Sequence, residues 1–146
     1  MLELTKEQVK DAIFVDTGAE VLYGQDQEFI CYPHVFATVT IELCASDMLV
    51  EIADDIRRAE GFTPLRDSCD GWYNMYIGIN DATKTKVDNS ISFLPVYDGE
   101  DSEHVYSIPL SEEVQVETFK VLDEQLKQAF GKGCDEMLEE ARKELA

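Results

Sequence analysis

Residues 35–44 alternate strictly between two sets of side chains, and this pattern most limits what the chain can fold into. Successive side chains of a β-strand point to opposite faces of a sheet, so a period of two indicates a strand. One set is uniformly apolar, which predicts a strand with one buried face. That set is Val35, Ala37, Val39, Ile41 and Leu43, and the other is Phe36, Thr38, Thr40, Glu42 and Cys44.

Further strands are predicted on both sides of this segment. Residues 72–79, 90–97 and 104–110 alternate in the same way, and Pro95 suggests an edge or a bulge in the second of them. Residues 20–32 are weakly periodic and are interpreted as strand or loop. The links between the later strands are short and rich in turn residues, which favours antiparallel pairing in a meander.

Four segments are predicted to be helices. Thr5 and Gln8 fit a capping box, Ser46 or the residue after it can cap a second helix, and Ser111 can cap a third. Residues 134–146 carry apolar side chains at helical spacing and are expected to form a loosely attached terminal helix. The order predicts an α+β fold, with an antiparallel sheet of about four to five strands packed with helices on at least one face. Residues 1–146 are expected to form a single domain, because domains cluster near 100–150 residues.

The charge balance restricts the partners of the chain. There are 31 acidic residues and 12 lysines and arginines, which gives a formal net charge of −19. A chain this negative repels phosphate, so we expect neither direct nucleic-acid binding nor attachment to an anionic membrane. A basic protein is the partner that the charge favours.

The acidic residues are concentrated in two windows without lysine or arginine, residues 11–56 and 87–119. These windows contain 18 of the 31 acidic residues, and the rest of the chain is nearly neutral. Like charges repel and destabilise a compact chain, so their concentration suggests a functional reason. We expect the two windows to form one continuous anionic surface.

The expected partner-binding residues lie on the second helix, in the turn over 98–103 and at the start of the third helix. Carboxylates three or four residues apart on a helix stand about 5–6 Å apart, a spacing of the order of the phosphate repeat in nucleic acid. Such a surface can enter a groove lined with Lys and Arg on a protein that handles nucleic acid. The residues are Glu51, Asp54, Asp55, Asp98, Glu100, Asp101, Glu103, Glu112, Glu113 and Glu117.

In composition and size the chain resembles small acidic inhibitors that occupy the nucleic-acid site of a basic protein, such as antirestriction, anti-CRISPR and nuclease-inhibitor proteins. The resemblance implies a nucleic-acid mimic that acts by occlusion. Trp72 and Tyr76 could anchor a partner if their side chains are exposed. The alternative is a non-catalytic accessory or oligomerisation domain with a merely solvated acidic surface, in which the apolar stripe of 134–146 supports a homodimer.

Catalysis and metal binding have little support in the sequence. No nucleophile elbow, Gly-rich phosphate loop or zinc-protease motif is present, so we expect no enzyme and no cofactor. Cys31 and His34 form a C-x-x-H pair, which is half of a zinc site, but no second pair accompanies it. A metal-binding protein or an enzyme is therefore the last of the alternatives.

The sequence favours the cytoplasm. Residues 1–7 lack the basic and apolar regions of a signal peptide, and no apolar run approaches the ~20 residues that span a bilayer. The four cysteines are irregularly spaced, which is typical of reduced thiols rather than of a disulfide framework.

Overall fold

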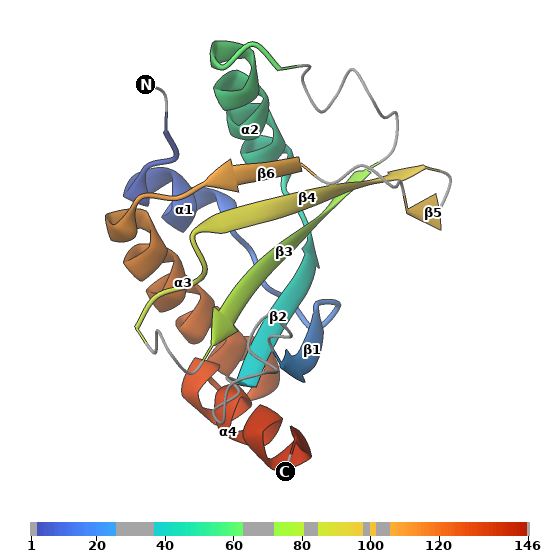
Figure 1. Cartoon of the computed structure of the whole chain (residues 1–146), viewed down its shortest axis with the longest axis vertical. Helices are drawn as coiled ribbons and strands as arrows, with labels where there is room; N and C mark the ends of the chain where they lie inside the picture. The colour runs from blue at the N-terminus through green and yellow to red at the C-terminus, as the bar shows by residue number, and fades with distance from the viewer. Residues whose placement is uncertain are drawn as a thin grey trace, which may run out of the picture.

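The computed structural model describes residues 3–25, 37–62, 72–80, 85–97, 100–101 and 106–145. Within them the chain forms an α+β fold in which helices pack against one face of an antiparallel sheet (Figure 1). The elements are α1 (Lys6–Ala12), β1 (Glu20–Gln25), β2 (Ala37–Cys44), α2 (Asp47–Ala59), β3 (Trp72–Asn80), β4 (Ser90–Tyr97), β5 (Glu100–Asp101), β6 (Tyr106–Pro109), α3 (Glu112–Phe130) and α4 (Cys134–Leu145). This architecture confirms the predicted fold class.

The strands of the sheet follow one another in chain order, and the last position is shared by two short strands. Strands β1, β2, β3 and β4 lie side by side in chain order and pair antiparallel, and both β5 and β6 pair with β4. The register places Ile41 between Val21 and Ile77. The predicted strand over 104–110 is observed at Tyr106–Pro109. In the weakly periodic region 20–32 the strand covers Glu20–Gln25, and the rest lies outside the described residues.

The apolar side chains whose alternation predicted β2 are the ones that are buried in the structure. Ala37, Val39, Ile41 and Leu43 are buried against the helices, and the side chains between them are more exposed. The same pattern continues on β3, where Met75, Ile77 and Ile79 are buried. The sheet therefore has a helix-covered apolar face and an opposite, more polar face, which we call the open face.

The helix ends also follow the predicted signals. Thr5 and Gln8 form the capping box of α1, and the Ser46 and Ser111 side chains accept hydrogen bonds from backbone N–H groups in the first turns of α2 and α3. Gly131 ends α3 with a φ of 74°, a left-handed conformation that costs glycine little.

Helix α4 is firmly packed, so the expected loose attachment is wrong. Its apolar stripe is buried against the sheet and α3, and Met137 and Leu138 are each only 2% exposed. The Asp123 carboxylate on α3 accepts a hydrogen bond of 2.7 Å from the Cys134 backbone N–H at the start of α4. Further along α4, Glu140 accepts a hydrogen bond of 2.7 Å from the Tyr23 hydroxyl on β1. Met137, Leu138 and Ala141 of this stripe are thus covered within one chain.

Candidate partner-binding surface

Helix α2 carries acidic side chains along its outer side. Asp47, Glu51 and Asp55 follow one another at intervals of four residues, which places neighbouring Cβ atoms about 5–6 Å apart. All three are exposed, and we call them the α2 acidic face. Asp55 forms a long ion pair of 3.9 Å with Arg58, and both side chains stay largely in solvent. This face leaves negative charge available to a partner.

Asp54 does not belong to the α2 acidic face, and its predicted exposure is wrong. Its side chain is only 2% exposed. Helix α2 buries a wide arc, and Val50, one turn before Asp54, is also buried. The four-residue spacing puts both side chains on the inner edge of the helix.

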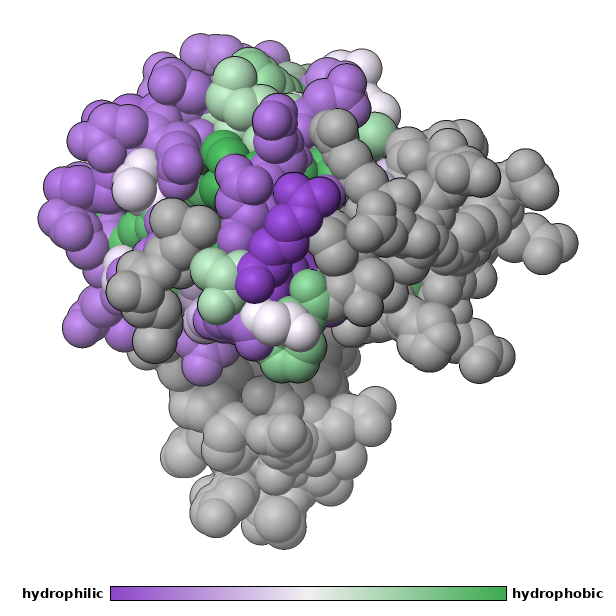
Figure 2. Space-filling model, turned by 90° about the horizontal axis from the view of Figure 1, so that it is seen from above, coloured by the Kyte–Doolittle hydropathy of each residue, from purple (hydrophilic) through white to green (hydrophobic). Residues whose placement is uncertain are grey.

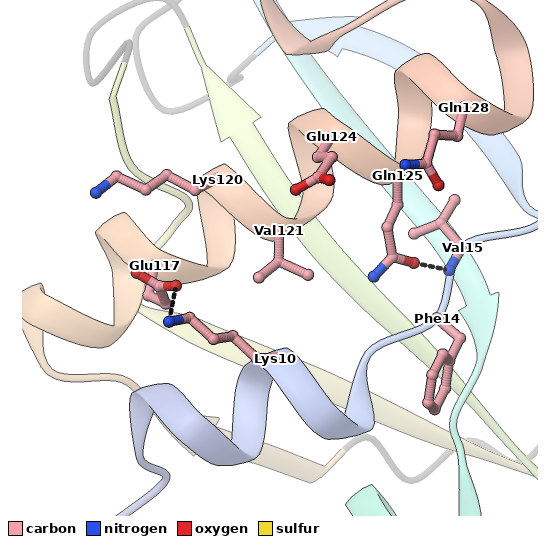
Figure 3. A pocket seen from close by; sticks show the side chains of 9 residues that line it. All are labelled: Lys10, Phe14, Val15, Glu117, Lys120, Val121, Glu124, Gln125 and Gln128. Atoms are coloured by element: carbon pink, nitrogen blue, oxygen red, sulfur yellow. Dashed lines mark hydrogen bonds and ion pairs between the residues drawn. The ribbon is translucent and has the colours of Figure 1, made fainter.

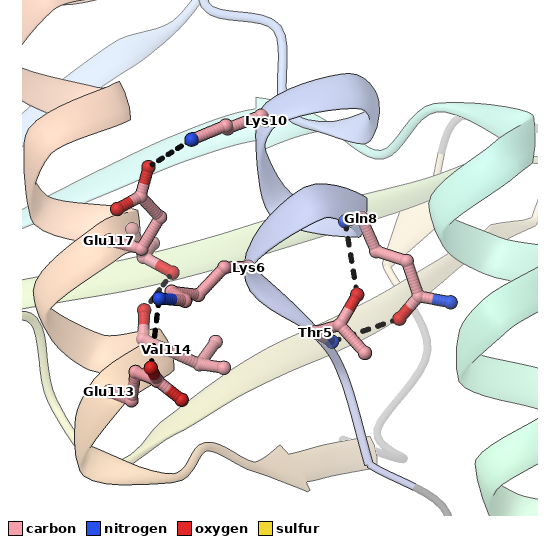
Figure 4. Close-up of polar contacts among 8 residues, drawn as sticks. Thr5, Lys6, Gln8, Lys10, Glu113, Val114 and Glu117 are labelled. Atoms are coloured by element: carbon pink, nitrogen blue, oxygen red, sulfur yellow. Dashed lines mark hydrogen bonds and ion pairs between the residues drawn. The ribbon is translucent and has the colours of Figure 1, made fainter.

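The acidic residues at the start of α3 are paired with lysines. Glu112 forms an ion pair with Lys86 at 3.3 Å, Glu113 with Lys6 at 2.8 Å, and Glu117 with Lys10 at 3.3 Å. The pairs with Lys6 and Lys10 join α1 to α3 (Figure 4). All three lysines lie outside the window 87–119, so the sequence window did not reveal the pairing.

One of these pairs is strong enough to alter the basicity of its lysine. The hydrogen bond from Lys6 to Glu113, together with the negative charge of that carboxylate, raises the pKa of the Lys6 amine above its usual value. The start of α3 is thus held to α1 by matched charges. It has less negative charge to offer a partner than its sequence suggests.

The acidic residues of the turn over 98–103 lie apart from those of α3. Glu100 and Asp101 form β5, which pairs with Tyr97 and Val96 at one end of β4. Pro109, three residues before the start of α3, pairs with Ser90 at the other end of β4. Asp98 and Glu103 lie outside the described residues. Among the described residues, Glu100 and Asp101 are therefore not brought together with the acidic residues of α3, and one continuous surface formed by the two windows stays a prediction.

The open face of the sheet holds a polar cluster that the sequence analysis did not single out. Glu20 and Glu42 lie directly opposite each other on β1 and β2. The Glu42 carboxylate accepts hydrogen bonds from Asn74 at 3.3 Å and from the Tyr76 hydroxyl at 3.2 Å. The sequence signal for this cluster is Glu42, a charged residue that follows Thr38 and Thr40 on the polar side of the alternation. Tyr76 is half-buried in this network, and nothing is described of the Trp72 side chain.

The open face meets the α2 acidic face at the end of β2, around Cys44. Burial and then the nearby charges of Asp47 and Asp16 raise the pKa of the Cys44 thiol. Both carboxylates are therefore close to this thiol although they are far apart in sequence. The α1–α2 junction here is fixed by the Ser46 hydroxyl, which donates a hydrogen bond of 2.7 Å to the Ala12 carbonyl.

Apolar side chains emerge beside this junction. Phe14, which follows α1, is 61% exposed, and Met48 in the first turn of α2 is 49% exposed. Viewed from the end at which α2 lies, the described surface is mainly hydrophilic with separate apolar patches (Figure 2). Exposed aromatic residues and methionines are typical of a surface that contacts protein.

A groove of about 620 Å³ lies between α1 and α3 (Figure 3). Its polar groups already bind one another: Lys10 pairs with Glu117, and the Gln125 amide bonds the Val15 N–H and the Ile13 carbonyl at 2.5 and 2.7 Å. Lys120 and Glu124 add one charge of each sign. The groove is the packing boundary between two helices, and its lining residues give no charge or hydrogen-bonding pattern that favours a particular ligand.

Metal binding and membrane insertion find no support in the described residues. The Cys31–His34 pair lies outside them. No group of three or more possible metal ligands occurs among the residues that are described. None of the helices described is long and apolar enough to cross a membrane.

The comparisons with known proteins add no identification. No protein-family model, no curated protein and no solved structure matches the chain.

Proposed function

We propose that the chain is a small cytoplasmic binding protein that inhibits a basic partner by occupying its nucleic-acid-binding surface. It acts without catalysis and without a cofactor. The contact is made by the α2 acidic face, with Met48 as an apolar component. The observation that carries the proposal is the exposed row of carboxylates on α2, in which the ion pair of Asp55 with Arg58 is long at 3.9 Å.

The spacing of this row suits contact with a partner surface that normally binds the phosphates of nucleic acid. Carboxylates one helical turn apart stand about 5–6 Å from each other, so the row presents regularly placed negative charge to a lysine- and arginine-lined groove. Met48 lies three residues before Glu51 and seven before Asp55, on the same side of the helix. A partner therefore meets an apolar group among the charges, which adds affinity to electrostatic attraction.

The experiment starts by capturing partners from the native host at low salt and eluting them at high salt. An eluted basic protein that loses its nucleic-acid binding when this chain is added identifies the partner. The double variant Glu51→Gln/Asp55→Asn is then compared with Glu112→Gln/Glu117→Gln, which makes the same change in net charge on α3.

The α2 variant is expected to slow association about tenfold at low salt, within the range of electrostatic steering, and the α3 variant to change it much less. Equal effects of the two variants would show that only net charge matters and would refute the α2 contact. If no basic protein elutes, or if the eluted protein keeps its nucleic-acid binding, the inhibitor proposal falls. The accessory-domain alternative then remains.

A further inference from the structure

The two edges of the sheet are protected to different degrees. At one edge, β5 has two residues and β6 has four, of which the last is Pro109, a residue without a backbone N–H. At the other edge, β1 has six residues and contains neither proline nor lysine. Natural sheets usually protect an exposed edge with short strands, proline, lysine or a bulge, and β1 has none of these.

Strand β1 is also regular enough to pair with another strand. Its register with β2 runs without a break from Glu20 opposite Glu42 to Gln25 opposite Ala37, so no bulge bends it away. It lies at the outer side of the sheet, and no strand among the described residues pairs with its other side (Figure 1). Within the described part of the chain no backbone group bonds to this outer row of N–H and C=O groups, so the row can template a further strand.

The side chains of β1 specify what such a strand would carry. Glu20, Leu22 and Gly24 point to the open face, and Leu22 is 44% exposed although it is apolar. Val21 and Tyr23 point to the helix-covered face and are partly buried. Cross-strand neighbours stand about 4.5–5.5 Å apart, so each of these positions selects the residue beside it.

We propose that β1 accepts an extended segment of the partner as an additional strand of the sheet. A Lys or Arg would lie beside Glu20, where it relieves the repulsion between Glu20 and Glu42. An apolar residue would cover Leu22, and an aromatic ring would lie across Gly24, a glycine that leaves room for it. This inference rests on the proposed function, since it describes a second contact with the same basic partner.

A second copy of this chain fits the edge poorly. Each copy carries a net charge of −19, and the pairing would bring the acidic residues of two copies together. The complementary charge lies on a basic segment.

The probes are two synthetic peptides in which valine alternates with lysine, leucine and phenylalanine. The second peptide has the reversed sequence, so that one of the two fits whether the added strand runs parallel or antiparallel to β1. The control has the same sequence with N-methylated amides along one edge, which keeps its charge and removes its strand pairing. Hydrogen exchange of the full-length protein locates binding. At least one of the two unmethylated peptides is expected to slow exchange of the β1 amides tenfold or more, and the methylated ones are not.

Two protein variants complete the test. Leu22→Lys is expected to weaken binding of the peptide at least tenfold, whereas Phe62→Lys, the same substitution at another exposed apolar residue, is expected to leave it unchanged. The proposal is overturned if methylated and unmethylated peptides bind alike, if protection falls on α2 instead of β1, or if Leu22→Lys binds normally. Protection of β1 that grows with protein concentration alone would identify a second copy as the occupant and would also overturn it.

The outcomes separate this inference from the proposed function. The double variant Glu51→Gln/Asp55→Asn is expected to leave peptide protection of β1 intact. If β1 binds the peptide but no inhibited basic protein is captured, the strand site stands and the inhibitor proposal falls. If capture succeeds and β1 stays unprotected, the inhibitor proposal stands and the strand site falls.

Discussion

Helices α2 and α3 carry similar numbers of acidic residues in their sequences but use them differently. On α2, Glu51 and Asp55 face solvent, and the ion pair of Asp55 with Arg58 is long. On α3, Glu112 and Glu117 pair with Lys86 and Lys10 at 3.3 Å. The acidic residues of α3 thus help to hold the fold together, whereas Glu51 and Asp55 of α2 lie at the surface.

A window without basic residues in the sequence is therefore not always a negative surface in the fold. The partners of the α3 carboxylates come from α1 and from the segment before β4, which the chain folding brings alongside. A charge window therefore indicates an anionic surface only where neighbouring elements are acidic too, as around Asp16 and Asp47.

A cysteine thiol lies near each helix, Cys44 near α2 and Cys134 at the contact of α3 with α4. The largest effect on stability is expected from the ionisation of Cys134. Burial, with the charges of Asp123 and Asp135, raises the pKa of the Cys134 thiol to about 12. The unfolded chain loses this proton near pH 9 and the folded chain keeps it, so stability is complete below pH 9 and is lost as the pH rises toward 12. Linkage predicts a loss of about 1.4 kcal/mol per pH unit in this range.

Urea unfolding between pH 8 and pH 11 tests this expectation, with Cys134→Ala as the matched variant. The variant should be the less stable protein at pH 8, because it loses buried contacts, and should fall less steeply above pH 9. The burial of Tyr23, whose pKa is raised to about 12, makes both proteins decline above pH 10. Parallel curves for the two proteins would contradict the assignment to Cys134.

The next effect compares the ion pairs of α3, at 3.3 Å, with the carboxylates of α2, where the ion pair of Asp55 with Arg58 is 3.9 Å long. Glu112→Gln/Glu117→Gln removes two ion pairs and is expected to lower the free energy of unfolding by about 1 kcal/mol. Glu51→Gln/Asp55→Asn removes a repulsion between like charges four residues apart and is expected to raise it by a few tenths of a kcal/mol.

Thermal unfolding at low salt resolves these two shifts, which should have opposite signs. In a chain of this size a change of 1 kcal/mol moves the midpoint by about 2–4 °C. High salt should shrink both shifts, but least the part that comes from Glu117, whose side chain is only 14% exposed. Shifts of the same sign would show that the acidic residues of α2 are as much a part of the fold as those of α3.

The smallest effect is a change in the reactivity of Cys44, which depends on the electrostatic field near the α2 acidic face. Because Asp16 and Asp47 help to raise the pKa of the Cys44 thiol, Asp16→Asn should increase its thiolate fraction. We expect iodoacetamide to modify Cys44 about twice as fast at pH 8 in this variant. The buried Cys134 serves as an internal control, and an unchanged Cys44 rate would place Asp16 too far away to matter.

Much of the fold could be predicted because its signals are local. The alternation of β2, the caps at Thr5, Ser46 and Ser111 and the stop at Gly131 depend on neighbours a few residues away. The firm packing of α4 could not be predicted, because it depends on Asp123 and Tyr23, which reach it from other elements.

The candidate surface was predicted less completely, for the same reason. Glu51 and Asp55 could be placed in solvent from helix periodicity alone. The burial of Asp54 depends on how α2 is seated on its neighbours, and the neutralisation of Glu112 depends on Lys86 in a separate segment. The facing of Glu20 and Glu42 depends on strand register, which a weakly periodic β1 does not fix.

The long reach of Gln125 on α3 has a consequence for the order of assembly during translation. Its amide hydrogen-bonds Val15 and Ile13, which precede it by 110 and 112 residues. The first helix therefore leaves the ribosome long before its docking site has been synthesised, while the antiparallel pair of β2 and β3, which α2 connects, can already form. Nascent chains stalled before α3 should expose an apolar sheet face to chaperones and proteases.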